Sequence, residues 1–189
     1  MKRIQVILVC VALTWLGTAA ADVELKIITP KGYVAFTVAD HWRVLLMETK
    51  MPVAAAVFQL PNPADQGTPD STNLIIQFFE RGSEKEKAVY AAPVTQHGSA
   101  PPKVSRFKEW KIFRQEALQG KTMYSIWDAK RDGMADVSVS VRLAWPHLPN
   151  NPPGYNDEME KTFRTFLDYV SGGFGKHTPK KGEVIRRLQ

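Results

Sequence analysis

The sequence predicts an α+β fold in which helices flank an antiparallel β-sheet. Apolar and polar residues alternate with a period of two over residues 136–145, as expected for a strand with one face on a core. Apolar residues recur at helical spacing between Met159 and Val170. Short turn signals such as Asp132-Gly133 separate neighbouring strands. Together these observations indicate a sheet of consecutive strands with helices packed on it.

Most of the chain has the pattern of strands. The expected strands cover residues 24–29, 33–38, 42–47, 53–60, 74–79, 110–118, 122–129 and 136–145. The segment 74–79 is apolar on both faces, which predicts a central strand covered on both sides. The last three strands are joined by short turns at Gly120 and Asp132-Gly133, so we expect a three-stranded antiparallel meander there. Its tryptophans, Trp110, Trp127 and Trp145, are expected in the core.

Two segments are expected to be helical. Ser83 and Glu86 have the spacing of a capping box, and residues 85–92 can continue as a helix up to Pro93. The second helix begins with Asn156 as its cap and ends at Gly172-Gly173. Its apolar stripe is expected to pack on the core and consists of Met159, Phe163, Phe166, Leu167 and Val170.

Three short patterns resemble the Mog1/PsbP-like superfamily. They are Phe36-x5-Trp42-x-Val44, Tyr124-Ser-Ile-Trp127 and Phe163-x-x-Phe166, within residues 32–170. Asp40-His41 departs from the step that the family usually has before its tryptophan. The resemblance implies an α/β/α sandwich and a binding or accessory role. The superfamily includes photosystem subunits, a GTPase-binding factor and envelope proteins similar to immunity proteins, and it implies no catalytic residue.

The first 21 residues have the layout of a cleavable signal peptide. Lys2 and Arg3 precede an apolar stretch over residues 4–16, and Ala19-Ala20-Ala21 provides a small-residue cleavage site. A membrane anchor that is never cleaved is the alternative. We expect residues 22–175 to form one globular domain and residues 176–189 a basic, flexible tail. The mature protein is expected in the periplasm, with secretion beyond the cell left open, and no later stretch can span a membrane.

Composition argues against several kinds of function. Cys10 is the single cysteine and is removed with the leader, so the mature chain has no thiol for disulfides, catalysis or metal binding. Residues 22–175 carry 18 basic and 18 acidic side chains, so the net charge of +6 comes from the two ends of the chain. A neutral body lacks the basic face of a duplex-binding domain, and no nucleic-acid partner is expected.

We find no catalytic or metal-binding motif in the sequence. Gly-x-Ser-x-Gly is absent, and Ser105 and Lys108 have Ser-x-x-Lys spacing on the approach to a predicted strand rather than on a helix. The four histidines are not paired at metal-binding spacing: His41, His97, His147 and His177. No catalytic residue, metal or cofactor is therefore predicted.

Three segments, 61–72, 95–104 and 147–155, have the composition of surface loops. The first is long for a connection between strands, and long loops are often functional. We expect it to contact a partner through Asp65, Thr68, Asp70, Ser71, Thr72 and Asn73. Asp65, Asp70 and Asn73 also offer oxygen ligands that suit calcium, but they lack EF-hand spacing.

The sequence therefore favours an exported binding or accessory protein that recognises another envelope or secreted protein. Inhibition of a toxin and support of an envelope complex are the two roles considered, and the oligomeric state is open. One alternative is an envelope hydrolase whose carboxylates, from Asp128, Asp132 or Asp136, meet only in the folded chain. Another is binding of a small ligand or lipid in a cleft between sheet and helix.

Overall fold

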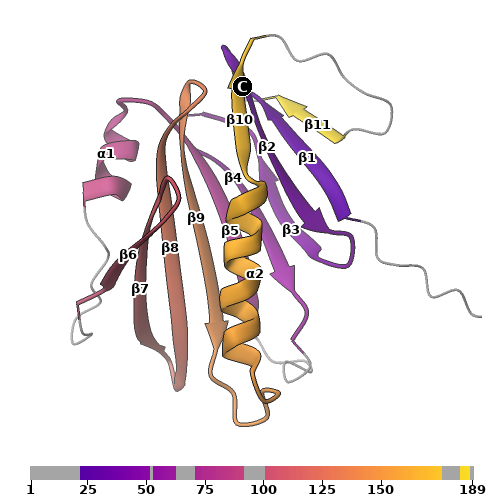
Figure 1. Ribbon diagram of the computed structural model, residues 1–189, viewed down its shortest axis with the longest axis vertical. Coiled ribbons are helices and arrows are strands. Elements are labelled where there is room, and N and C mark those ends of the chain that lie inside the picture. Colours follow the sequence, from indigo (N-terminus) through magenta and orange to yellow (C-terminus); the bar gives the residue numbers. More distant parts are fainter. Residues whose placement is uncertain (1–21, 52, 63–70, 92–100, 176–183, 188–189) are drawn as a thin grey trace, which may run out of the picture.

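The computed structural model describes residues 22–51, 53–62, 71–91, 101–175 and 184–187 (Figure 1). Strands account for 60% of these residues and form two sheets, whereas the described residues contain only two short helices. The predicted α+β fold with helices flanking the sheet as layers is therefore wrong, and the chain is a β-rich protein. A second sheet takes the place of a helical layer.

The larger sheet has seven strands, and every neighbouring pair is antiparallel. Its order is β3 (Arg43–Glu48), β4 (Val53–Leu60), β5 (Thr72–Glu80), β9 (Val137–Pro146), β8 (Thr122–Met134), β7 (Trp110–Gln119) and β6 (Lys103–Phe107). The predicted meander is confirmed by β7, β8 and β9. The predicted central strand is confirmed by β5, which lies between β4 and β9.

The smaller sheet has four strands, ordered β10 (Ser171–Phe174), β2 (Gly32–Ala39), β1 (Asp22–Ile28) and β11 (Val184–Arg187). β11 runs parallel to β1 and falls within the segment expected to be a tail. β10 contains Gly172 and Gly173, which the sequence had marked only as the end of a helix. A strand this short and glycine-rich has no alternating pattern, so its pairing with β2 could not be anticipated.

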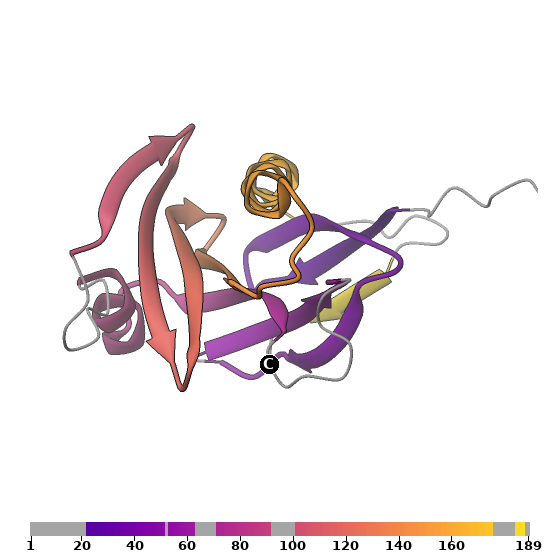
Figure 2. The same ribbon diagram turned by 90° about the horizontal axis from the view of Figure 1, so that it is seen from below.

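The core lies between the two sheets and α2 (Tyr155–Tyr169). Figure 2 shows α2 end-on in the hollow of the curved larger sheet, beside the smaller one. The predicted apolar stripe is confirmed, because all five of its residues are buried. Phe166 packs on Phe36 of β2 with ring centroids 5.8 Å apart, and Phe163 packs edge-on against Trp127 of β8 at 5.8 Å. The three meander tryptophans are buried, as predicted.

The other helix, α1 (Glu84–Ala91), lies on the opposite face of the larger sheet (Figures 1 and 2). Half of its predicted capping box is confirmed, because the Glu86 backbone N–H donates to Ser83 Oγ at 3.2 Å, whereas the Ser83 backbone N–H donates to the Glu80 carbonyl and not to Glu86. The Glu86 carboxylate accepts from the Gly82 backbone N–H and from the hydroxyl of Ser138 on β9. One glutamate thus closes the helix start and fastens the helix to the sheet.

The β8–β9 connection differs from the predicted Asp132-Gly133 turn. β8 continues through Asp132-Gly133 to Met134, and its register with β9 shifts between Arg131 and Met134, so the glycine lies in a bulge with φ of 69°. The turn itself is formed by Ala135 and Asp136. The Asp136 carboxylate accepts hydrogen bonds from the Thr29 hydroxyl and, at 3.1 Å, from the Lys31 backbone N–H. These contacts with the β1–β2 connection of the smaller sheet therefore hold the turn of this hairpin in place.

Candidate functional site

Two of the three expected loops meet at one end of the molecule. The segment before β5 reaches the β9–α2 loop through Thr72, whose Oγ1 lies 2.7 Å from Tyr155 Oη in a buried hydrogen bond. Asn62, at the other side of the same segment, donates from Nδ2 to Asn151 Oδ1 at 3.4 Å. We call the surface formed by residues 62, 71–73 and 147–157 the loop end. It combines segments that are far apart in the sequence.

The structure places only part of the predicted contact loop. Asp65, Thr68 and Asp70 lie outside the described residues, and their role stays a prediction. Ser71 is half-buried, whereas Thr72 is fully buried and anchors the loop through Tyr155. Asn73 donates from Nδ2 to Ser71 Oγ at 2.8 Å, and its Oδ1 is buried without a hydrogen-bond partner among the described residues. The segment is therefore tied down where it enters β5.

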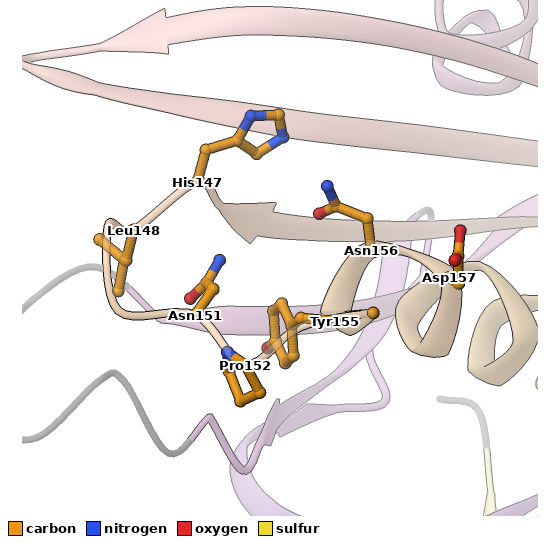
Figure 3. A pocket seen from close by; sticks show the side chains of 8 residues that line it. His147, Leu148, Asn151, Pro152, Tyr155, Asn156 and Asp157 are labelled. Carbon is orange, nitrogen blue, oxygen red and sulfur yellow. The ribbon is translucent and has the colours of Figure 1, made fainter.

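The loop end contains a pocket of about 410 Å³ (Figure 3). It is lined by His147, Leu148, Asn151, Pro152, Gly154, Tyr155, Asn156 and Asp157. Figure 3 shows Asn151 on the loop, and Tyr155, Asn156 and Asp157 on the first turn of α2. Asn151 Nδ2 donates to the Pro146 carbonyl at 2.8 Å, which holds the loop against the end of β9. The pocket thus offers amide, carboxylate and imidazole groups on a braced loop.

The predicted helix cap at Asn156 is wrong. The cap residue is Gly154, with φ of 79° and no side-chain capping hydrogen bond, and the helix begins at Tyr155. Asn156 Oδ1 instead accepts from the buried Trp145 indole N–H at 2.8 Å. A buried indole requires an acceptor, and this contact fixes the first turn of α2 on β9. The sequence pattern could not distinguish the two uses of the same amide.

The pair of Ser125 and His147 has the spacing of a nucleophile and a base, with Oγ and Nε2 separated by 2.8 Å. The His147 backbone N–H also donates to the Met123 carbonyl at 2.8 Å, which extends the β8–β9 ladder. Catalysis also requires a third group that orients the imidazole and a serine open to substrate. Ser125 is buried and does not line the pocket, so the contact is best understood as bracing the loop.

The three aspartates of the hydrolase hypothesis have separate surroundings. Asp128 is bound by Arg142, whose Nε and Nη2 donate to its two oxygens at 2.7 and 3.0 Å. Asp136 is held by Thr29 and Lys31, as described above, and Asp132 is exposed beside the bulge. Among the residues that the structure describes, the three carboxylates share no hydrogen-bonding partner. Within the described ranges, no group of three or more histidine, cysteine, aspartate or glutamate side chains could hold a metal ion.

Three charged residues, Asp128, Lys130 and Arg142, lie near one another on the outer face of β8 and β9, and Lys130 lies under α1. Lys130 is buried, donates to the Val89 carbonyl and lies 4.9 Å from the centre of the Phe113 ring. Burial lowers the pKa of Lys130, and Asp128 opposes this shift. Burial also lowers the pKa of Arg142, but its hydrogen bonds and charge pairing with Asp128 outweigh burial and leave that pKa raised. Asp128 and Arg142 pair with each other, and Lys130 has a backbone carbonyl as its acceptor, which indicates a structural role for these charged groups.

Tyr90 completes the attachment of α1 to this face. Its hydroxyl donates to the carbonyls of Arg131 and Val139 at 3.0 and 2.7 Å. Burial raises the pKa of Tyr90, and the neighbouring charges of Asp132 and Glu86 raise it further. The tyrosine is therefore a neutral donor that joins the helix to β8 and β9.

Two further cavities bear on the ligand-binding alternative. One of about 640 Å³ lies near the β8–β9 turn and is lined in part by Lys31, Arg81, Asp136 and Phe174. The other, of about 310 Å³, lies between β2 and α2 and includes Trp42, Phe166 and Tyr169. The second occupies the place expected for a sheet–helix cleft. Both are within or close to the size range of small-molecule sites.

No helix in the described part of the chain is long and apolar enough to cross a membrane. The sequence matches no model of a known protein family and no curated protein.

Proposed function

We propose that this chain is an exported binding protein that recognises another envelope or secreted protein through the loop end. The observation that carries the proposal is the hydrogen bonding of Thr72 to Tyr155 and of Asn62 to Asn151. These contacts bring the predicted contact loop and the β9–α2 loop onto one surface. Loops positioned by a rigid scaffold are the usual place for recognition in small domains.

The chemistry of the loop end supports a polar partner surface. Asn151 and Asn156 carry amides, Asp157 a carboxylate and His147 an imidazole around one pocket. Amide and backbone groups of a partner could complete such a surface, because interfaces typically contain about one hydrogen bond per 100–200 Å².

The export part of the proposal depends on residues 1–21, which the structure does not describe. Its support is the order of charge, apolar stretch and small residues in the leader. We place the mature protein in the periplasm on this basis, as a soluble accessory of an envelope complex or an inhibitor of a toxin.

Affinity capture tests the proposal. The mature chain, residues 22–189, is used as bait in envelope extract beside two variants. Leu148→Glu places a charge at the pocket, whereas Val104→Glu changes an exposed apolar residue on β6 and serves as the matched control. We expect one stoichiometric protein with the wild type and with Val104→Glu, and about tenfold less with Leu148→Glu. Equal capture by all three folded baits would reject the loop end as the contact surface.

A further inference from the structure

The edge strand β3 exposes a continuous apolar segment. Val44, Leu45 and Leu46 are 54%, 47% and 50% exposed, although they are consecutive residues of a strand. β3 pairs with β4 on one side and is the last strand of the larger sheet among the described residues. An apolar edge strand whose outer side pairs with no other described strand is a template for pairing with a strand of another molecule.

The opposite edge of the same sheet is different. β6 carries Lys103 and Arg106, both exposed, around a single exposed apolar residue, Val104. Both of these charges are positive, and like charges across paired strands oppose pairing with a second copy. Only β3 therefore combines an edge position with a run of exposed apolar side chains in the described part of the larger sheet.

The sequence of β3 is complementary to itself. In an antiparallel pair of two β3 strands centred between Leu45 and Leu46, Arg43 lies opposite Glu48 of the second copy, and Val44 opposite Met47. The same symmetry places Glu48 opposite Arg43 of the second copy. Both charged residues are exposed, and the Lys50 backbone N–H donates to Glu48 Oε1 at 2.9 Å, which holds the carboxylate at the strand end. Opposite charges across strands stabilise such a pair.

The bulge in β3 makes this pairing geometrically consistent. Residues directly opposite one another in an antiparallel pair point to the same face, but residues five apart in a regular strand point to opposite faces. The register with β4 shifts between Val44 and Leu46, so Arg43 pairs with Gln59 and Glu48 with Ala55. Those two β4 residues are four apart, so Arg43 and Glu48 share one face. Val44 and Met47, opposite Phe58 and Ala56, share the other.

From this self-complementarity we propose that the protein forms a two-fold symmetric homodimer in which β3 pairs with β3 of a second copy. The two larger sheets then join into one continuous antiparallel sheet. Leu45 and Leu46 lie at the centre of the interface, with an Arg43–Glu48 ion pair at each end. The dimer is independent of the loop end, which uses other strands and loops.

Sedimentation equilibrium of residues 22–189 over a concentration series tests this interface. We expect a reversible dimer for the wild type. Arg43→Glu alone or Glu48→Arg alone places like charges at both ends of the interface by symmetry, and each should weaken the dimer by about tenfold or more. The double reversal Arg43→Glu/Glu48→Arg should restore it. Arg106→Glu on β6 is the matched control and should leave dimerisation unchanged.

Mixing the two single variants gives a second readout, because each supplies the charge that the other lacks and a heterodimer should form. Circular dichroism and thermal unfolding verify that each variant is folded. A wild type that stays monomeric throughout the series would overturn the proposal. A dimer that persists in both single variants, or that neither the double reversal nor mixing restores, would overturn it as well.

Discussion

Thr72 Oγ1 and Tyr155 Oη form a buried hydrogen bond of 2.7 Å between residues 83 positions apart in the chain. The bond joins the first residue of β5 to the first residue of α2. It therefore fixes the two loops of the loop end relative to each other.

Tyr155→Phe should destabilise the protein by about 1–3 kcal/mol, because the fully buried Thr72 hydroxyl loses its partner. The double variant Tyr155→Phe/Thr72→Val removes both polar groups and should cost less than the sum of the single substitutions. Urea unfolding measures these free energies. Tyr169→Phe, at an exposed tyrosine of the same helix, is the control. Strictly additive effects would show that the two hydroxyls are not coupled.

Asn156→Leu should cost about 1–3 kcal/mol, because it removes the acceptor for the buried Trp145 indole N–H. Asn156→Asp retains an oxygen acceptor and adds negative charge at the helix start, so it should unfold near the wild-type midpoint. Chemical unfolding followed by tryptophan fluorescence compares the two variants. Equal loss of stability in both would argue that the amide acts through packing and not through this hydrogen bond.

Lys130 should make stability depend on pH in the alkaline range. Burial lowers its pKa in the folded state from the ordinary value of 10.5, so the unfolded state binds more protons between the two pKa values. The free energy of unfolding contributed by Lys130 therefore rises with pH through that window and levels off above 10.5. The difference between wild type and Lys130→Met, measured by urea unfolding, should increase as the pH approaches 10.5. Lys103→Met controls for loss of an exposed lysine, and a flat Lys130 difference would contradict the prediction.

Gly32→Ala should destabilise the smaller sheet. A Cβ at position 32 would lie 2.0 Å from the Gly173 carbonyl oxygen, and this backbone atom cannot give way without moving β10. We expect a loss of about 2–4 kcal/mol, which thermal unfolding would show as a lower midpoint. Ser171→Ala, at an exposed position of β10, should change stability by less than about 0.5 kcal/mol. An unchanged midpoint for Gly32→Ala would mean that β10 does not pair with β2 as described.

Local patterns predicted the elements whose side chains alternate or recur regularly. The apolar residues of β9, Val137, Val139 and Val141 among them, follow the period of two, although Ser138 and Ser140 on the other face are buried as well, and the α2 stripe follows helical spacing. The same reasoning failed for β10 and β11, because a Gly-Gly strand and a four-residue strand are stabilised by partners far away in the sequence. β10 and β11 extend the predicted hairpin of β1 and β2 into a second sheet, and the fold class was wrong because no local pattern separates that hairpin from the larger sheet.

The candidate site was predicted only in part. Loop composition pointed to residues 71–73 and to the segment 147–155, but no local signal shows that they meet. Their meeting depends on Tyr155 reaching Thr72 and on Asn62 reaching Asn151, which are tertiary contacts. The contact between Ser125 and His147 was missed because it depends on where the chain turns after β9. Sequence patterns predict individual helices and strands, whereas the site forms only when these elements pack together.

Residue-specific photo-crosslinking in the native envelope tests the loop end as a protein-recognition surface most directly. A photoreactive amino acid is placed at Ser71, at Leu148 or, as a control, at Val104 of β6. We predict that the first two positions give the same single protein adduct and that the third gives none. Adducts of equal yield from Val104, or no adduct from either loop-end position in folded protein, would contradict the account.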